Sequence, residues 1–295
     1  MSGPVIEEYT RRLPAPALRP LVAAYSGYRE AGVPPARHRG LPSPYLTVIV
    51  TLDDPLVVAA HPDPRTPPGA YDTLVGGLHT RPAMIVHDGR QSGVQLALTP
   101  PGARALLGLP AGELAGLDVD GADLLGPLAH ELRERLLLAD GWPERFDVLD
   151  AVLLRRVSAG RPGRTGAGPS REVMRAWNLI TSTRGGVSVA DVAGEVGWST
   201  RHLGARFRAE IGLGPKEAAR VARFDLARRV LQSAEGSRRT LAELAAACGY
   251  YDQAHLAREF GALAGCPPSR WLNEEPVAFR NVQAAAGALP ADSPP

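Results

Sequence analysis

Cysteine and lysine are almost absent from this chain of 295 residues. Lys216 is the single lysine, so arginine carries nearly all the positive charge. Together with the abundant alanine, glycine and proline, we attribute this to a GC-rich coding bias. The two cysteines, Cys248 and Cys266, do not form a closely spaced pair, which argues against a zinc site. We expect both thiols to be small buried core groups, with no disulfide between them.

Long apolar runs are missing as well. No segment approaches the about 20 apolar residues of a membrane-spanning helix. The N-terminus also lacks the positive cluster and following apolar core that are typical of a secretion signal. We therefore expect a cytoplasmic protein that has no membrane partner.

The net charge of +2 is small for a protein that binds nucleic acid, but this charge is unevenly distributed. Residues 1–160 contain 15 arginines and 18 acidic residues, a balance of −3. Residues 161–295 contain 18 basic and 13 acidic residues, a balance of +5. Attraction to phosphate needs positive charge at the contact, so the second half is the candidate nucleic-acid binder. A chain of this length is also expected to form two domains.

The second half contains the same helix-turn-helix pattern twice. Residues 188–207 align with residues 240–260 at a shift of 52, which becomes 53 after one residue is inserted in the turn. Each copy opens with Ser or Thr and has an acid three positions later, which is the signature of a capping box. Apolar residues then follow at helical spacing. A repeat this regular indicates an architecture and not a coincidence of composition.

A glycine turn separates the two helices of each copy. Gly197 and Gly249 stand where a left-handed residue ends the first helix, and Ser199 or Asp252 caps the second helix almost at once. The second helix has Leu and Phe four residues apart on its buried face. Its other face suits the major groove of B-DNA, where Gln pairs with adenine and Arg with guanine. The side chains on that face are Thr200, Arg201 and Arg208 in the first copy and Gln253 and Arg258 in the second.

A long helix is predicted over residues 215–232, between the two copies. This helix can hold the second helices of the two copies ~34 Å apart, which is the length of one turn of DNA. Both helices can then enter successive major grooves on one face of the duplex. A single helix pair with arginines on one face is as often a solvated surface as a DNA reader. Two copies joined by a long helix favour DNA binding over that alternative, and over a partner-binding module that has lost DNA binding.

The C-terminal half resembles the AraC/XylS family of bacterial transcription regulators. The resemblance covers about residues 170–271. It rests on the paired motifs, on Ala-Ala-Ala-Cys-Gly-Tyr-Tyr-Asp-Gln-Ala-His-Leu-Ala-Arg-Glu-Phe at 245–260, and on the closing Gly-Cys-Pro-Pro-Ser-Arg-Trp. It implies a seven-helix DNA-binding domain, here residues 170–276, and a sequence-specific regulator whose partner is double-stranded DNA. RNA polymerase and a second copy of the chain are further partners that the sequence leaves open.

The same resemblance implies which residues face the bases. The matching positions are Arg201 and Gly204 in the first copy and Gln253, Ala254 and Arg258 in the second. The chain departs from the family at Ala205, where many members have Arg, so we expect the first copy to rely on Arg201 and the readout to be unequal. Arg206 and Arg208 are expected nearer the phosphates. His255 completes the predicted DNA-binding set.

The first 160 residues follow a different pattern. Short segments rich in Val, Ile and Thr, separated by turn residues, predict a small antiparallel β-barrel or sandwich. The predicted strands are residues 45–52, 56–60, 73–78, 83–87 and 94–99, and the predicted helices are residues 103–107, 124–138 and 146–157. The fold class is therefore α+β, with an all-α C-terminal domain. Residues 161–169 are predicted to be a linker and residues 277–295 a flexible tail.

This layout resembles the cupin-like effector or oligomerisation domains of many AraC-type regulators. Residues 77–82 and 87–90 are similar to a branch of such regulators in actinobacteria. The resemblance implies control by a small-molecule effector, whose identity and binding residues stay unknown. Arg81 and Arg90 are a candidate clasp for an anionic effector, with solvated loop arginines as the better-supported alternative.

Metal and enzyme functions have weaker support. The four N-terminal histidines (His38, His61, His79 and His87) are irregularly spaced and include no His-X-His pair, so we predict neither a metal nor a cofactor. An alkyl-transfer repair enzyme needs a reactive N-terminal cysteine, and residues 1–247 contain none. A metal-dependent cupin-type enzyme is the remaining enzymatic alternative. The leucine stripe at residues 125–136 is expected to pack in the core rather than against a second chain.

Overall fold

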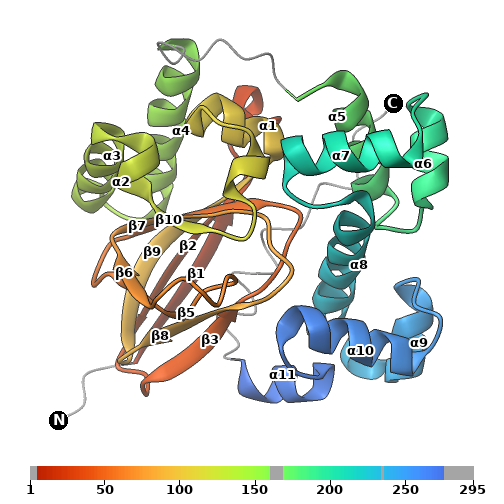
Figure 1. The fold of residues 1–295 in the computed structure, drawn as a ribbon. Coiled ribbons are helices and arrows are strands. Elements are labelled where there is room, and N and C mark those ends of the chain that lie inside the picture. Colours follow the sequence, from red (N-terminus) through yellow and green to blue (C-terminus); the bar gives the residue numbers. More distant parts are fainter. Residues whose placement is uncertain (1–4, 160–168, 234–235, 276–295) are drawn as a thin grey trace.

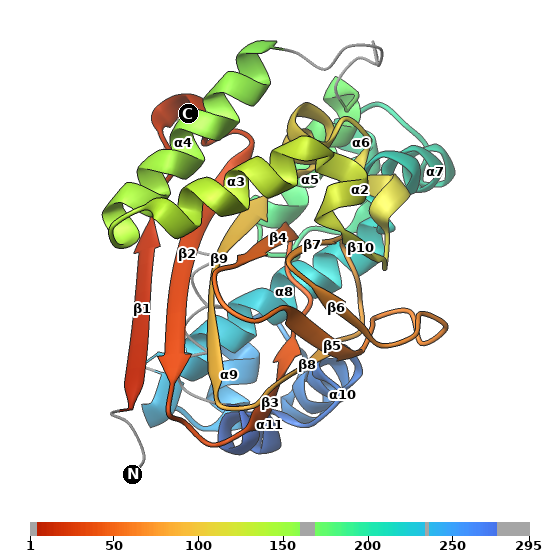
Figure 2. The same ribbon diagram turned by 90° about the vertical axis from the view of Figure 1, so that its left-hand side faces the viewer.

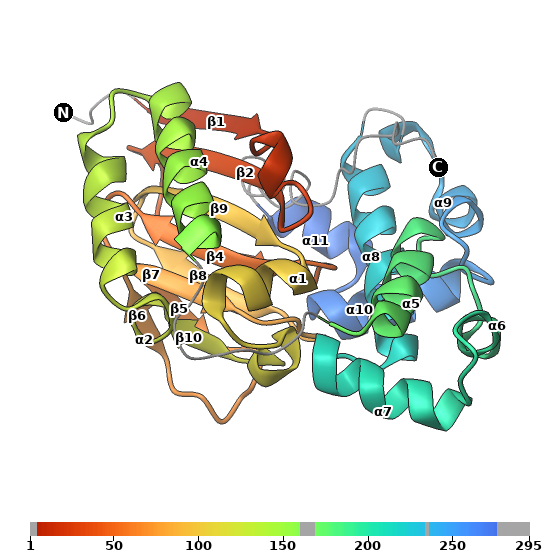
Figure 3. The same cartoon turned by 90° about the horizontal axis from the view of Figure 1, so that it is seen from above.

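The computed structural model describes residues 5–159, 169–233 and 236–275. A β-rich N-terminal domain and a helical C-terminal domain lie side by side (Figures 1 and 3). The predicted α+β fold class is therefore confirmed. Only the last residue of the predicted linker 161–169 is described, and the predicted tail 277–295 lies outside the described residues. Within the described ranges, no helix is long and apolar enough to cross a membrane.

The N-terminal domain contains two antiparallel sheets, which stay separate and do not close into a barrel. The larger sheet has the order β1 (Ile6–Arg12), β2 (Val22–Ala31), β9 (Arg90–Leu98), β4 (Leu46–Thr51), β7 (Thr73–Gly76) and β10 (Asp118–Asp120). The smaller sheet has the order β3 (Ala36–Gly40), β8 (Ala83–His87), β5 (Leu56–Ala60) and β6 (Gly69–Tyr71). The predicted β-rich domain is therefore present, but it consists of two separate sheets in place of the predicted cupin-like barrel.

All five predicted strands are present, as β4, β5, β7, β8 and β9, with small shifts at their ends. The prediction missed β1, β2, β3, β6 and β10. The first three of these lie in a stretch whose proline and glycine content suggested loops. β2 is nevertheless central, because it pairs with β1 on one side and with β9 on the other. Pairing with residues about 60 positions away in the chain, such as Tyr28 with Gly93, stabilises a strand that has little local signal.

The helix predicted over residues 124–138 is wrong at its start. α2 (Gly121–Leu125) ends at Gly126, whose φ of 60° lies in the left-handed region. Pro127 follows, and it opens α3 (Pro127–Leu138) because proline suits the first position of a helix and not its interior. The sequence thus contains a helix stop and a helix start where the leucine spacing alone indicated one continuous helix.

The leucine stripe packs in the core, as predicted. Leu132 and Leu136 of α3 are buried in the main apolar cluster of the chain. α3 and α4 (Trp142–Ala159) together cover one face of the larger sheet (Figure 2). Asp150 fixes α4 there, since its carboxylate accepts hydrogen bonds from the Tyr25 hydroxyl at 3.0 Å and from the Ala15 N–H at 2.9 Å.

Seven α-helices form the described part of the C-terminal domain. They are α5 (Arg171–Ser182), α6 (Val189–Glu195), α7 (Thr200–Ile211), α8 (Pro215–Gln232), α9 (Leu241–Ala247), α10 (Gln253–Ala264) and α11 (Pro268–Glu274). α8 lies where the connector was predicted, at roughly residues 215–232, and runs between the other two groups of helices (Figure 1). Cys248 and Cys266 are free and buried, as predicted, and burial raises the pKa of both thiols.

The two domains pack against each other at several points. The turn η3 (Ala111–Leu114) of the N-terminal domain lies on the end of α7, and a Cβ added to Gly112 would be 2.1 Å from the carbonyl oxygen of Ala209. Arg39 of β3 donates from its backbone N–H to the buried carboxylate of Glu275 at 2.7 Å and from its guanidinium to Glu274 at 2.7 Å. The N-terminal domain therefore contacts α7 of the first helix-turn-helix unit and the α11 end of the C-terminal domain.

Candidate nucleic-acid interface and effector pocket

The first helix of each unit is capped as its sequence predicts. The Ser188 hydroxyl accepts from the N–H of Asp191 at 3.1 Å, and the Thr240 hydroxyl accepts from the N–H of Glu243 at 3.2 Å. Only the second unit has the complete capping box, because the Glu243 carboxylate accepts from the Thr240 N–H at 2.7 Å. This hydrogen bond lowers the pKa of Glu243 below its usual value. The shorter Asp191 instead accepts from the Ser188 hydroxyl at 2.7 Å.

The turn and the second helix also follow the prediction. Gly197 and Gly249 adopt φ values of 70° and 73°, which glycine reaches without steric cost. The Ser199 hydroxyl then accepts from the N–H of His202 at 3.2 Å, and the Asp252 carboxylate accepts from the N–H of His255 at 2.6 Å. The Leu and Phe side chains predicted to face inward are fully buried in both α7 and α10. Each unit therefore holds its second helix by a cap at one end and a buried face along its length.

Most of the predicted DNA-facing residues lie on the exposed face of these helices. Thr200, Arg201, Gln253, Ala254 and Arg258 are exposed, and Gly204 is half-buried. Within the described parts of the chain, the side chains of Arg201, Gln253 and Arg258 form no hydrogen bond or ion pair. A guanidinium or amide group that has no partner within the protein can bind the edge of a base without first breaking a hydrogen bond or ion pair.

Arg206 and Arg208 differ from those three residues, because each lies near a carboxylate. Arg206 donates to Glu210 at 2.7 Å, and Glu210 also accepts from the Ser170 N–H at 2.7 Å. A guanidinium nitrogen of Arg208 is 3.6 Å from Glu217. Arg208 also lines a cleft between the two domains, opposite residues 78–81. The positive charge of Arg206 and Arg208 is therefore partly balanced within the protein. In this respect they differ from Arg201, Gln253 and Arg258, which have no such partner in the described chain.

His255 is held within the turn, although it belongs to the predicted DNA-binding set. Its Nδ1 accepts from the Tyr251 N–H at 3.3 Å, and its ring meets the edge of Tyr250 at 5.3 Å. The first unit has the equivalent contact between His202 and Trp198 at 4.6 Å. These two ring pairs are a feature of the repeat that the sequence reasoning did not identify.

The sequence reasoning also missed Tyr251, whose side chain is 93% exposed beside the start of α10. A large aromatic group so fully in solvent is unusual, because its apolar surface gains nothing there. Tyr251 is the residue inserted in the second copy of the repeat, and that insertion was the available signal.

α8 connects the two units through side-chain contacts as well as through the chain. Its 18 residues correspond to a length of ~27 Å. Arg223 donates to the carbonyl oxygen of Gly185, in the loop just before the first unit, at 2.8 Å. Arg220 donates to Glu259 of α10 at 2.6 Å. α8 also packs against α7 of the first unit and α9 of the second, so it sets the relative position of the two units.

A second candidate site lies inside the N-terminal domain, where a pocket opens between the two sheets. Its empty volume is about 840 Å³ with its open mouth included. The apolar wall consists of Leu41, Ile49, Leu56, Val58, Leu74 and Ile85. The polar groups include Tyr28, His38, Thr47, His79, Gln95 and Asp118 from the N-terminal domain and Arg228 from α8.

The four N-terminal histidines do not gather at one point. His38 and His87 are neighbours with ring centres 6.2 Å apart, whereas His61 bonds to Asp118 at 2.7 Å. Burial lowers the pKa of His38 well below its usual value, so this ring is neutral at neutral pH. In the described residues, no group of three His, Cys, Asp or Glu side chains could hold a metal ion.

Arg81 and Arg90 lie at different pockets and do not form one clasp. Arg90 is bound by two acids of the β4–β5 turn, with distances of 2.5 Å to Asp54 and 3.3 Å to Asp53. Its side chain is half exposed. This arrangement supports the interpretation of Arg90 as a solvated loop arginine.

Comparison with known protein families identifies the two domains. Residues 192–274 match a model described as a helix-turn-helix domain. Residues 10–120 match a model described as a domain of unknown function (DUF6597). No curated protein matches the sequence.

Solved structures share the fold of most of the chain, across both domains. ToxT from Vibrio cholerae is 9% identical with a TM-score of 0.51, and the alignment covers 92% of this chain and 98% of ToxT. Unsaturated fatty acid bound wild-type ToxT from Vibrio cholerae strain SCE256 is also 9% identical with a TM-score of 0.52, covering 92% of this chain and 95% of that one. At this identity the likeness establishes the fold.

The fold and the paired helix-turn-helix units define a DNA-binding transcription regulator with an additional N-terminal domain. The C-terminal domain is a helix-turn-helix domain of the AraC type.

Proposed function

We propose that this regulator reads a specific DNA sequence with α7 and α10 and that a small molecule in the N-terminal domain controls the binding. The observation that carries the proposal is the pair of capped helices whose exposed Arg201, Gln253 and Arg258 side chains have no partner within the described chain. The helix N-termini and surrounding arginines would set the register on the phosphates. The three unpaired side chains would then discriminate bases, and each good bidentate pair contributes about 1–3 kcal/mol.

Control by a small molecule is supported by the position of the pocket. It is concave and largely apolar with a few polar groups, which is the usual character of a ligand site. Arg228 of α8 reaches its wall, so the pocket and the DNA-binding domain share a residue. The binding of an unsaturated fatty acid by ToxT supports a ligand-controlled regulator on this fold.

We further propose that the protein is not an enzyme and acts in the cytoplasm, where a bacterial regulator meets its DNA. The absence of cysteine from residues 1–247 argues against alkyl-transfer repair chemistry. RNA polymerase and a second copy of the chain are the partners we propose beyond DNA, because a regulator must act on transcription and often binds paired half-sites.

The dependence of DNA affinity on salt tests the proposed function. We expect the logarithm of the affinity of the full chain for genomic duplex fragments to fall linearly as the logarithm of salt concentration rises, because bound arginines release counterions from the phosphates. Fluorescence anisotropy over a series of salt concentrations measures this slope. Replacing Arg90 by Ala is the matched control, since this arginine lies in the N-terminal domain and should leave the slope unchanged. Absent binding, or binding that salt does not affect, would refute DNA recognition.

A further inference from the structure

β1 leaves one long edge of the larger sheet open. It stands at the end of the strand order and pairs with β2 alone, over all its seven residues and without a bulge. The other edge strands of the described chain are protected: β6 and β10 have three residues each, and the backbone N–H of Arg39 in β3 donates to Glu275. β1 lies at the outer margin of the molecule in Figures 2 and 3. A long open edge is a template for pairing with a further strand.

The sequence along this edge is complementary to itself. Residues 5–13 read Val-Ile-Glu-Glu-Tyr-Thr-Arg-Arg-Leu, with Tyr9 at the centre. Glu7 and Arg11 are equally distant from Tyr9, as are Val5 and Leu13. A second copy that pairs antiparallel about Tyr9 therefore sets each Glu7 opposite an Arg11, each Val5 opposite a Leu13, and Tyr9 opposite itself. Opposite charges and paired aromatic rings across two strands are stabilising, whereas parallel pairing in register would oppose like charges.

The side chains that would meet are open to solvent in a single copy. Val5 is 63% exposed and Leu13 is 39% exposed, which makes them two of the few large apolar residues in solvent. Glu7 is exposed and forms no hydrogen bond or ion pair within the described chain. A second copy on this edge would cover both apolar groups and place a guanidinium beside Glu7. Arg12 is outside this argument, because it already bonds to Asp147 at 2.6 Å.

We propose that the β1 edge is a homodimer interface, in which two copies pair antiparallel about a two-fold axis at Tyr9 and join their larger sheets. This inference rests on the proposed function, because it names the surface by which the second copy binds. The axis is perpendicular to the sheet, so α3 and α4 of both copies stay on the same face. Two DNA-binding domains related by a two-fold axis suit two copies of a DNA site arranged as a palindrome.

Cross-linking of the full chain tests the axis. In Tyr9→Cys the two new thiols lie opposite each other with Cα atoms about 4.5–5.5 Å apart, which a disulfide can span. Mild oxidation with copper–phenanthroline should give a covalent dimer on a non-reducing gel, since the native Cys248 and Cys266 are buried. Glu7→Cys is the matched control, because its two thiols are four residues out of register, or ~14 Å apart. No cross-link in Tyr9→Cys, or equal cross-linking in both variants, overturns the inference.

Charge exchange tests the pairing without a cross-link. Sedimentation equilibrium of the unchanged chain should show a dimer that dissociates on dilution. Glu7→Arg and Arg11→Glu should each raise the dissociation constant of the dimer at least about tenfold, because like charges then meet at both ends of the interface. An equimolar mixture of the two variants restores opposite charges and should dimerise like the unchanged chain, which a misfolded variant would not do. A chain that is monomeric at every concentration, or a mixture as weak as its components, contradicts the proposal.

DNA binding separates this inference from the proposed function. Glu7→Arg should still bind a single site, because β1 belongs to the N-terminal domain, and should lose the cooperative binding of two sites. Fluorescence anisotropy on duplexes that carry one or two sites measures both. An unchanged chain that binds DNA but never dimerises overturns this inference alone. A dimer that binds no DNA overturns the proposed function alone.

Discussion

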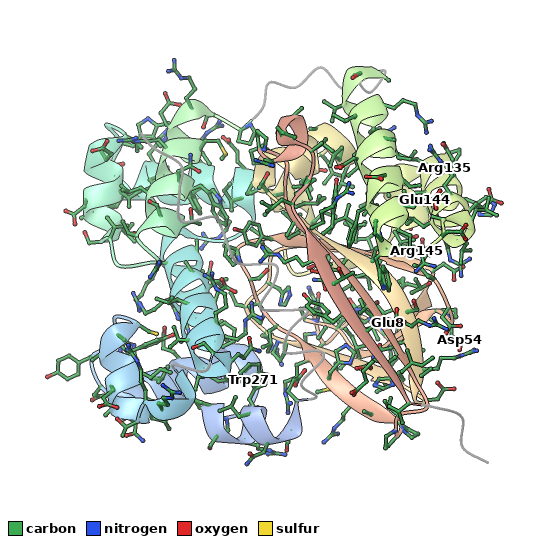
Figure 4. The ribbon with its side chains drawn as sticks, turned by 180° about the vertical axis from the view of Figure 1, so that it is seen from behind. Glu8, Asp54, Arg135, Glu144, Arg145 and Trp271 are labelled. Atoms are coloured by element: carbon green, nitrogen blue, oxygen red, sulfur yellow. The ribbon has the colours of Figure 1, made fainter. Side chains whose placement is uncertain are left out.

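Replacing Trp271 by alanine is expected to lower the free energy of unfolding of the C-terminal domain by about 3–5 kcal/mol. Trp271 is completely buried in α11, and its ring centre lies 5.5 Å from that of Phe260, which in turn meets Phe224 of α8 at 5.0 Å. Figure 4 shows Trp271 among the helices of the second unit. Its removal leaves a cavity between α8, α10 and α11, so the second recognition helix loses its support. Denaturant unfolding followed by circular dichroism measures the change.

Two further substitutions serve as controls for the loss of stability expected from Trp271→Ala. Trp271→Phe keeps an aromatic ring in the core and gives up a buried indole N–H that has no partner in the described chain, so its cost should be much smaller. Trp198→Ala removes a half-buried tryptophan from the turn of the first unit and should also cost less. A loss below about 1 kcal/mol for Trp271→Ala would show that α11 does not support the second unit.

The second large effect is expected on DNA recognition. Arg258→Ala should weaken binding to the preferred DNA sequence by about 1–3 kcal/mol and relax the preference at one base position, because a bidentate contact to guanine is lost. The side chain is exposed and unpaired within the described chain, so its removal should leave the fold unchanged. Affinities for the preferred duplex and for its single-base variants measure both effects. A uniform loss across all the duplexes would mean that Arg258 contacts phosphate alone.

Arg206→Ala is the matched control for that substitution. Arg206 is exposed on α7 and already bonds to Glu210, and we place it beside the phosphates. Its removal should weaken binding to all sequences by a similar factor and leave the order of preference unchanged. A selective loss at one base pair would instead make Arg206 a base reader and would overturn the division between paired and unpaired arginines.

Much of the C-terminal domain could be predicted because its signals are local. Caps, turn glycines and the Leu–Phe spacing indicated α6, α7, α9 and α10, and the helical spacing of the apolar residues between the two copies indicated α8. The N-terminal domain was harder, because β1 and β2 depend on partners that are distant in the sequence. The helix predicted over residues 124–138 was also wrong at its start, because the leucine spacing continues across Gly126, where the helix breaks.

The two candidate sites also differ in how far the sequence could predict them. The exposed face of α10 follows from helical periodicity, so Gln253 and Arg258 could be selected from the sequence. Arg228 could not, because the sequence shows it as one of several arginines interleaved along a helix. Its burial arises when the N-terminal domain packs against α8, which brings together residues such as His38 and Arg228 that are distant in the chain. Long-range packing of this kind leaves no periodic signal.

Footprinting of the full chain on DNA selected from a genomic library tests the central claim most directly. The two helix-turn-helix units, held together by α8, should protect two stretches on one face of the duplex, about 10–10.5 base pairs apart. Sequence preference should be stronger in the stretch read by α10, because α7 has Ala205 where a longer side chain could read a base. A single protected stretch, or no sequence preference in either one, would contradict the account.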